Sequence, residues 1–457
     1  MARLFGTDGV RGAYGTDLTD ALARTLGYAA ARVLADPDHE APRILIGRDT
    51  RRSGPALERA LADGIRAAGG VPVSCGVMPT AGVAYLVATD GFAAGAVISA
   101  SHNPAGDNGI KFFGPDGMKL PDAVEDAIEA AMASAPEIEA SSPVIGSIEG
   151  LGESAIIGGV IEESTLGDEL YLKFLLKDVP SLQGLRVVVD CANGAASNLA
   201  PEAYRDAGAD VTVLFADPDG TNINANCGST HPETLIEVVR RTGAHIGIAH
   251  DGDADRMLAV DAHGELVDGD QILGIVALDA AARGELPDNA VVTTVMANIG
   301  FRRAMREAGI ELVETAVGDR YVLQAMREGG IAMGGEQSGH LIFLQRHTTG
   351  DGILTALQLL GVIARTRTDL SGLAKQIPRF PQVLENVRVP SKDGLLNAAA
   401  VEEAIRNAEA TLGDTGRVLV RPSGTEPVIR VMAEAADDAA ARAAVATVVT
   451  ALRSATA

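Results

Sequence analysis

The stretch from Ile98 to Phe113 concentrates side chains that could do chemistry. Two serines, a histidine and a lysine surround a turn fixed by a proline. Apolar runs at 94–98 and 110–113 predict buried strands on both sides. A polar loop held between rigid strands is where proteins often place reactive groups. We interpret Ser101 as a nucleophile or a covalent carrier of phosphate. Taken alone, the stretch is equally compatible with a Ser/Asn/Pro turn that only reverses the chain.

Three carboxylates, Asp251, Asp253 and Asp255, alternate with Gly and Ala directly after a predicted strand. In an extended stretch every second side chain points the same way, so we expect them to converge. Converging carboxylates favour a cation, and ligands that are all oxygen suit Mg²⁺. An EF-hand is excluded because Arg256 stands at its required Gly position and Ala262 at its required Glu position. The alternative is a solvated acidic turn.

A loop near the C-terminus combines arginines, hydroxyls and a glycine. Arginine forks, hydroxyls and free backbone N–H groups are the chemistry of phosphate binding. The alternative is a hairpin turn with surface arginines. The residues predicted to bind phosphate are Arg421, Ser423, Gly424, Thr425 and Arg430.

Two weaker patterns complete the set of candidate sites. Glu336 and Ser338 fall on one side of a segment if it is extended, and a carboxylate with a hydroxyl can grip vicinal sugar hydroxyls. A glycine-rich turn explains the same residues. Arg48, Arg51 and Arg52 could form a second anion site, although for Arg51 and Arg52 a solvated charge cluster is favoured.

Composition limits the classes of function. The net charge of −23 and an aromatic content of 3%, without tryptophan, argue against nucleic acid or an acidic membrane as a partner. The three cysteines have no metal-like spacing, which is typical of buried thiols in a reducing compartment. The N-terminus lacks the apolar core of a signal peptide, and no run is long enough to span a membrane. We expect a cytoplasmic protein with a small-molecule partner.

The 457 residues predict an α/β chain of several domains. Three successive units share the order strand, polar loop, strand, with helices between the strands, which indicates three similar α/β domains with mainly parallel sheets. From residue 380 the order changes to βαββα, which indicates a smaller α+β domain. The domains are predicted at 1–160, 161–262, 263–376 and 377–457, with the serine, metal, sugar and phosphate loops respectively.

Five motifs occur together, and with them the chain resembles the α-D-phosphohexomutase family over nearly its whole length. They are FGTDGVRG (Phe5–Gly12), SASHNP (Ser99–Pro104), DGDADR (Asp251–Arg256), GEQSGH (Gly335–His340) and RPSGTEP (Arg421–Pro427). Within the family, FGTDGVRG, the segment 315–320 and Gln337 favour enzymes that act on glucosamine phosphates.

The resemblance implies four domains around a central cleft and a phosphoryl group carried on Ser101. One Mg²⁺ per chain would be held by phospho-Ser101 with Asp251, Asp253 and Asp255. The enzyme would be an isomerase that interconverts glucosamine 6-phosphate and glucosamine 1-phosphate through a bisphosphorylated hexosamine, on the route to UDP-N-acetylglucosamine and peptidoglycan.

Roles for further residues follow from the same resemblance. Arg11, together with Mg²⁺, would neutralise the charge of the transferring phosphoryl group. Either His102 or Lys111 would act as general acid/base or orient the phosphate. Glu336 and Ser338 would hold the sugar hydroxyls, while the arginine-rich loop would clamp the other phosphate. Because the intermediate must reorient, we expect a mobile C-terminal domain hinged near 377–381.

Several alternatives stay open from the sequence. A phosphomannomutase or phosphoglucomutase of the same fold is the nearest. A phosphosugar hydrolase and a non-catalytic phosphosugar sensor are more remote. The sequence does not decide between a monomer and a homodimer, nor how Ser101 is first phosphorylated.

Overall fold

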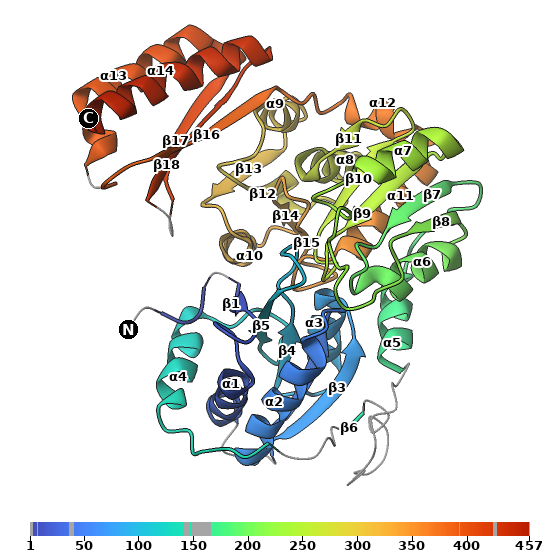
Figure 1. Cartoon of the computed structure of the whole chain (residues 1–457). Coiled ribbons are helices and arrows are strands. Elements are labelled where there is room, and N and C mark those ends of the chain that lie inside the picture. Colours follow the sequence, from blue (N-terminus) through green and yellow to red (C-terminus); the bar gives the residue numbers. More distant parts are fainter. Residues whose placement is uncertain are drawn as a thin grey trace. The chain divides into compact units, whose positions relative to one another are not determined.

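The computed structural model places the chain in two compact units (Figure 1). It describes residues 3–6, 8–35, 41–140, 146–147, 166–392, 394–423 and 427–456. The first unit comprises Met1–Met296 and Ile310–Lys375, and the second comprises Ala297–Gly309 and Gln376–Ala457. The boundary predicted between the first two domains, at residues 160 and 161, lies outside the described residues, and the description resumes in a helix that begins at Leu166.

The first unit contains three sheets of one design. Each has parallel strands in its middle and an antiparallel strand that leaves from one edge of the parallel set. The first sheet has the order β1-β5-β4-β2-β3-β6. Its strands are β1 (Val10–Ala13), β2 (Arg43–Arg48), β3 (Val71–Val77), β4 (Ala94–Ile98), β5 (Asp107–Phe113) and β6 (Gly146–Ser147).

The second and third sheets repeat this arrangement with fewer strands. Their orders are β11-β10-β9-β7-β8 and β13-β12-β14-β15. The second contains β7 (Arg186–Asp190), β8 (Asp210–Leu214), β9 (Ile246–His250), β10 (Met257–Asp261) and β11 (Leu266–Val267). The third contains β12 (Ala290–Thr294), β13 (Glu311–Thr315), β14 (Met333–Gly335) and β15 (Leu341–Phe343).

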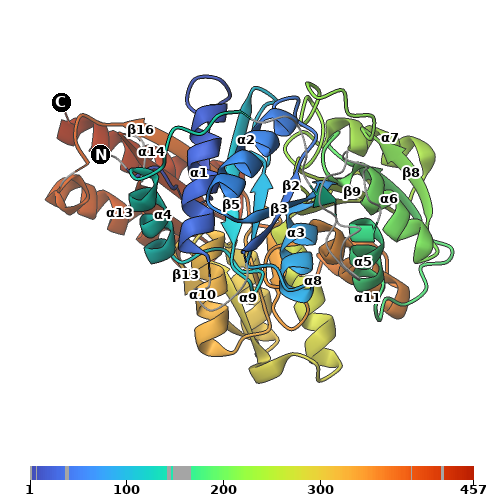
Figure 2. The same cartoon turned by 90° about the horizontal axis from the view of Figure 1, so that it is seen from below.

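Helices cover the sheets of the first unit. In the first domain, apolar residues of α1, α2 and α4 form one core with alternate residues of β2, β4 and β5. Figure 2 shows α1 and α2 running side by side across these strands. The helices of the unit are α1 (Asp20–Val33), α2 (Gly54–Ala67), α3 (Thr80–Thr89), α4 (Asp122–Met132), α5 (Leu166–Leu175), α6 (Ala196–Asp206), α7 (Glu233–Thr242), α8 (Gly269–Ala282), α10 (Asp319–Gly329), α11 (Gly352–Thr366) and α12 (Leu370–Ala374), with a 3₁₀ turn η2 (Pro287–Asn289).

The repeat predicted from the sequence is present in the strand connections. A parallel strand passes through a polar loop into an antiparallel strand three times, as β4 to β5, β9 to β10 and β14 to β15. Each sheet therefore keeps the expected parallel pairs and adds antiparallel pairing at one side, so the three sheets are mixed. The antiparallel exits follow from the polar segments, because a short loop can reverse the chain only between antiparallel neighbours.

The second unit holds an antiparallel sheet in the order β16-β18-β17. Alternate residues of β18, among them Ile429, Val431 and Ala433, pack with α13 and α14 in one core. The order βαββα predicted for this part is confirmed. Its elements are α9 (Ile299–Glu307), β16 (Gln382–Arg388), η3 (Leu395–Asn397), α13 (Ala399–Leu412), η4 (Gly413–Thr415), β17 (Arg417–Pro422), β18 (Val428–Glu434) and α14 (Asp438–Thr456).

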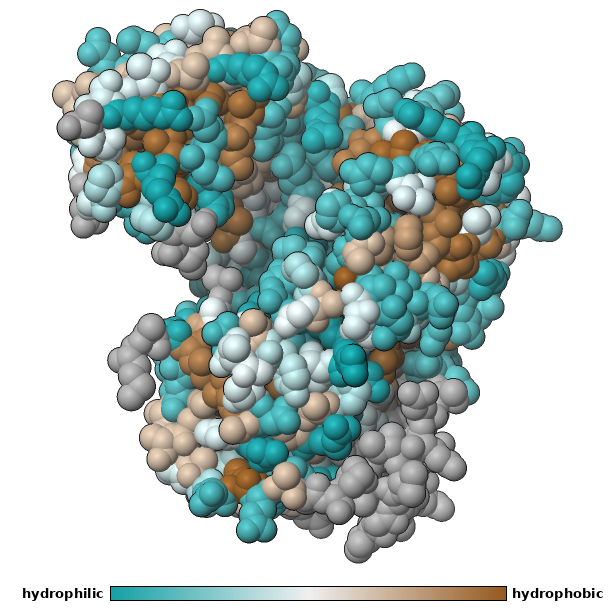
Figure 3. Space-filling model, viewed as in Figure 1, coloured by the Kyte–Doolittle hydropathy of each residue, from teal (hydrophilic) through white to brown (hydrophobic). Residues whose placement is uncertain are grey.

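The surface mixes hydrophilic and hydrophobic residues on the face shown in Figure 3, with hydrophilic residues predominating. Among the described residues, every helix is too short or too polar to cross a bilayer. All three cysteines, Cys75, Cys191 and Cys227, are buried free thiols, as expected.

Candidate active site

Ser101 lies in the loop between β4 and β5, with 1% of its surface exposed. Its backbone is left-handed, with φ of 50°, a strained conformation that often occurs at functional positions. The backbone N–H donates to Ser99 Oγ at 2.9 Å. The hydroxyl donates to Asp251 Oδ2 at 2.6 Å and lies 3.3 Å from His102 Nδ1. The structure thus brings the serine and metal loops, 150 positions apart, into direct contact.

Arg51 holds this conformation, and the expectation that it is a solvated surface charge is wrong. Its exposed fraction is 1%. The guanidinium pairs with buried Asp49 at 2.8 Å and donates to main-chain carbonyls of the serine loop. The burial follows from the loop itself, because its irregular backbone leaves carbonyls that only a donor from outside can satisfy. Arg52, by contrast, is exposed as expected. The carbonyls that accept from Arg51 are those of Ser101, Asn103, Pro104 and Asp107.

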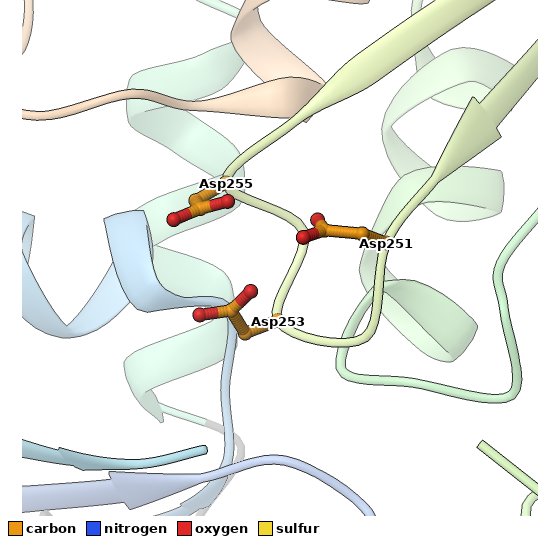
Figure 4. A group of neighbouring side chains, drawn as sticks. All are labelled: Asp251, Asp253 and Asp255. Carbon is orange, nitrogen blue, oxygen red and sulfur yellow. The ribbon is translucent and has the colours of Figure 1, made fainter. Parts of the chain in front are cut away.

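The three aspartates converge as predicted, but through a turn rather than an extended strand. Ala254 takes a left-handed φ of 58° and reverses the chain between Asp253 and Asp255. The carboxylates face a common space in Figure 4, and one oxygen of each lies within 4.8 Å of the others. Gly252 permits the loop to approach the serine loop, because a Cβ there would meet the carbonyl oxygen of Ser101 at 2.5 Å.

The donor set fits a hard divalent cation. Asp253 Oδ1 and Asp255 Oδ1 are buried without a hydrogen-bond partner among the described residues. Burial, with the charges of Asp255 and Asp253, raises the pKa of Asp251 well above its usual range. Although burial opposes it, His340, Lys111 and Arg256 lower the pKa of Asp255. Three such carboxylates are charged together only with added positive charge, and their oxygens suit Mg²⁺.

Cations surround these carboxylates. Lys111 on β5 donates to Asp253 Oδ2 at 2.7 Å and lies 3.7 Å from Asp255. Burial lowers the pKa of Lys111, but Asp253, Asp8 and Asp255 together raise it above its usual value. Burial lowers the pKa of His102, and the charges of Arg256 and Arg11 act in the same direction. The lysine is therefore a fixed positive charge, whereas His102 is a neutral imidazole beside the hydroxyl of Ser101.

Arg11 lies on β1, next to β5 in the first sheet. Its guanidinium donates to Asp8, while its Nε is buried without a hydrogen-bond partner in the described part of the chain. Arg11 thus belongs to the same group of charges as Lys111, which lies 3.9 Å from Asp8.

The loop between β14 and β15 joins the metal loop through its backbone. The N–H of Met257 donates to the carbonyl of Gly339 at 3.1 Å. Glu336 accepts from the N–H of Gly318 at 3.0 Å, which leaves its second oxygen for another partner. Ser338 Oγ is buried and has no hydrogen-bond partner among the residues described. Both predicted sugar-binding side chains therefore retain hydrogen-bonding capacity.

His340, at the end of that loop, was named only as part of a motif. Its Nδ1 lies 3.5 Å from Asp255 and its Nε2 lies 3.7 Å from Asp319. Burial lowers its pKa, but the two carboxylates overcome this effect and raise it. Arg256 similarly lies 3.7 Å from Asp255 and 4.0 Å from Asp251. Sequence reasoning gave neither side chain a role, although both stand in the quoted motifs.

The second unit carries the predicted phosphate cluster. Arg421 and Arg430 are directly paired across β17 and β18, so their side chains share one face of the sheet. Burial and the charge of Arg430 lower the pKa of Arg421. Ser423 is buried, and its carbonyl accepts from Lys392 Nζ at 2.7 Å. Lys392 adds a cation that the sequence did not single out. Gly424 and Thr425 lie outside the described residues.

Two adjacent arginines with a lysine nearby favour an anionic ligand, and the first unit brings together a serine, carboxylates and cations. Family models of the phosphoglucomutase/phosphomannomutase class match the chain in four parts. They are α/β/α domain I at residues 2–139, domain II at 169–264, domain III at 268–380 and the C-terminal domain at 384–451. The chain belongs to this family of mutases, which confirms the four-domain α/β organisation.

Curated relatives make the comparison more specific. A protein of Symbiobacterium thermophilum named phosphoglucosamine mutase is 54% identical over 438 residues, covering 96% of both chains. Proteins of the same name from Desulforamulus reducens and Rhodococcus jostii are each 52% identical, covering 96% and 97% of both chains.

Solved structures extend the likeness to the fold. A phosphoglucomutase/phosphomannomutase family protein from Burkholderia thailandensis has a TM-score of 0.81 and 27% identity, covering 99% of this chain and 97% of that one. The N-acetylphosphoglucosamine mutase of Aspergillus fumigatus, solved with GlcNAc-6P and magnesium, has a TM-score of 0.68 and 20% identity, covering 99% and 96%.

Proposed function

We propose that the protein interconverts glucosamine 6-phosphate and glucosamine 1-phosphate, with Ser101 as the phosphoryl carrier. The contact between Ser101 Oγ and Asp251 is the observation that carries the proposal, because it sets a hydroxyl at the edge of a buried carboxylate cluster. Relatives that share more than half of their residues with this chain support the choice of substrate. The product would feed the synthesis of UDP-N-acetylglucosamine and the cell wall.

The proposed reaction has two transfers. Phospho-Ser101 gives its phosphoryl group to a sugar hydroxyl: the Oγ–P bond breaks, a bond from phosphorus to the sugar oxygen forms, and the hydroxyl proton passes to a base. The bisphosphorylated sugar then reorients and returns its other phosphoryl group to Ser101. Such transfers depend on in-line positioning and charge neutralisation more than on covalent help from the protein.

The residues of the first unit suit these tasks. Lys111 and Arg11 supply fixed positive charge. His102, whose Nδ1 lies 3.3 Å from Ser101 Oγ, is an imidazole at the site that can accept the proton. Asp251, Asp253 and Asp255, together with phospho-Ser101, would hold one Mg²⁺, which would neutralise charge on the transferring group. Glu336 and Ser338 would hold the sugar hydroxyls.

In the second unit, the proposed role is to clamp the phosphate that is not reacting. Arg421, Arg430 and Ser423 are the described side chains for this task, and Gly424 and Thr425 complete the predicted set. The arginine pair across β17 and β18 supports the assignment, because two like charges on one face favour an anion between them. A hinge near 377–381 and the domain limits given above stay predictions.

The test joins mass spectrometry to a mutase assay. Phosphate on Ser101 of the purified protein is expected, and Ser101→Ala should lose both the phosphate and the activity. Full mutase activity in Ser101→Ala would refute the carrier role.

Turnover on glucosamine, glucose and mannose 6-phosphates then decides the substrate. A large preference for mannose or glucose phosphate would replace the proposed substrate with that of a phosphomannomutase or phosphoglucomutase. Release of free phosphate in step with substrate loss would instead indicate a hydrolase.

A further inference from the structure

Lys119 occupies a position that neither the reaction nor the motifs explain. It lies between the turn after β5 and the start of α4, with 12% of its side chain exposed. Its ammonium pairs with Asp8 of the N-terminal loop and with Asp319 at the start of α10. These two carboxylates are 311 positions apart in the sequence, and one lysine joins them.

The two pairs of Lys119 close a ring of alternating charges. Lys111 lies 3.9 Å from Asp8 and 3.7 Å from Asp255. Beyond Asp255, the imidazole of His340 lies 3.5 Å away and reaches Asp319 at 3.7 Å on its other side. Every described member belongs to the first unit. In order, the ring is Asp8, Lys111, Asp255, His340, Asp319 and Lys119.

Asp8 is the member that could interfere with catalysis. Its Oδ2 faces Arg11 and Lys111, and its Oδ1 faces Lys119. Asp8 accepts from Arg11 and lies 3.9 Å from Lys111, so its negative charge offsets part of the positive charge that these two cations present to a phosphoryl group. Lys119, on the other carboxylate oxygen, compensates the charge of Asp8 and fixes the carboxylate in place.

We propose that Lys119 is a positioning residue for phosphoryl transfer, which fixes Asp8 and compensates its negative charge beside Arg11 and Lys111. The inference rests on the proposed function of these two cations. Lys119 does not touch the reacting atoms and acts through Asp8.

The pair with Asp319 gives Lys119 a second role, as a link between two segments of the first unit. Asp319 follows Gly318, whose N–H donates to Glu336 at 3.0 Å. The pair between Lys119 and Asp319 therefore links the segment after β5 to the backbone that supports the sugar loop. Loss of Lys119 would release both connections at once.

The test compares Lys119→Met with the double variant Lys119→Met/Asp8→Asn. The single variant should lower kcat by about tenfold to a hundredfold, the range for a displaced catalytic group. The double variant should recover much of that loss, because an amide cannot neutralise Arg11 and Lys111. If Lys119 had only a structural role, adding Asp8→Asn would lower kcat further. Lys173→Met, an exposed lysine on α5, is the matched control and should leave kcat unchanged.

Thermal unfolding and the phosphate content of Ser101 are measured on each variant, so that loss of fold is separated from loss of positioning. If Lys119→Met does not fold, Lys119→Arg retains a cation, and the effect of adding Asp8→Asn is measured in that background. A wild-type kcat in Lys119→Met, or a double variant no more active than the single one, overturns the proposal. An inactive wild-type protein would instead refute the proposed function.

Discussion

Replacement of Arg51 by methionine should disable the serine loop. The substitution removes the cation from Asp49, which is fully buried, and one donor from each carbonyl that accepts the guanidinium. Breaking a buried pair by removing one partner costs about 3–5 kcal/mol. Asn224 Nδ2 still donates to the carbonyls of Ser101 and Asn103, so part of the loop keeps a partner. We therefore expect a loss of unfolding free energy near the lower end of that range.

Activity should fall further than stability alone predicts. The left-handed backbone of Ser101 persists only while its surroundings fix it, and a shift of about 1 Å in a reacting group costs about a hundredfold in rate. The assays are mutase turnover, urea unfolding and hydrogen exchange of residues 99–108. Arg51→Lys retains a charge but cannot reach the same carbonyls, so it should regain stability more than activity.

Arg52→Met is the matched control, because Arg52 is the exposed neighbour. It should change the unfolding free energy by less than about 0.5 kcal/mol. A variant of Arg51 with wild-type exchange in the serine loop and wild-type turnover would refute the view that this arginine fixes the loop.

Three further outcomes are expected. Asp253→Asn should weaken Mg²⁺ binding, measured by calorimetry, by roughly tenfold or more. The reason is that it alters a buried carboxylate oxygen that lacks a hydrogen-bond partner among the described residues. Unchanged affinity would show that Asp253 is not a metal ligand. Gly194→Ala should also weaken Mg²⁺ binding, because its Cβ would meet the Gly252 carbonyl oxygen at 2.3 Å, and an unaltered metal affinity would show that the loop can yield without cost. Burial raises the pKa of Asp190 from 3.8 to about 6. A raised pKa means that the folded protein binds the proton more tightly, so this contribution is complete below pH 3.8 and lost as pH rises through 6. The unfolding free energy of wild type relative to Asp190→Asn should fall by about 2.4 kcal/mol between pH 4 and 7, and a difference that stays constant over this range would contradict the prediction.

The fold was largely predictable because its signals are local. Apolar runs such as 94–98, and the polar segments that follow them, mark strands and loops directly. The family motifs indicated the domain order. The direction of the strands that follow the polar loops was harder to predict from the sequence, because it depends on which strands become neighbours in the sheet. The convergence of the three aspartates was predicted from an extended segment, whereas the structure achieves it by a left-handed turn at Ala254. The sequence has no glycine at that position to indicate such a turn.

Arg51 and Lys119 show what the sequence could not supply. Both are charged residues that simple patterns place on the surface. Arg51 is buried and Lys119 has only 12% of its side chain exposed, in each case among partners far along the chain. Arg51 has its carbonyl partners 50 or more positions away, and Lys119 pairs with Asp319, 200 positions away. Only the folded backbone shows that such a cation has enough acceptors to be buried.

The pair between Lys111 and Asp253 also constrains how the chain is made. Asp253 lies 142 positions after Lys111. At synthesis rates of about 5–20 residues per second, the lysine waits roughly 7 to 30 s for this partner. Until then the first domain contains a cation at its site whose carboxylate partners, apart from Asp8, have not been synthesised. The site of the nascent first domain is consequently incomplete. The charge cluster forms only when the second domain, with Asp253 and Asp255, has left the ribosome.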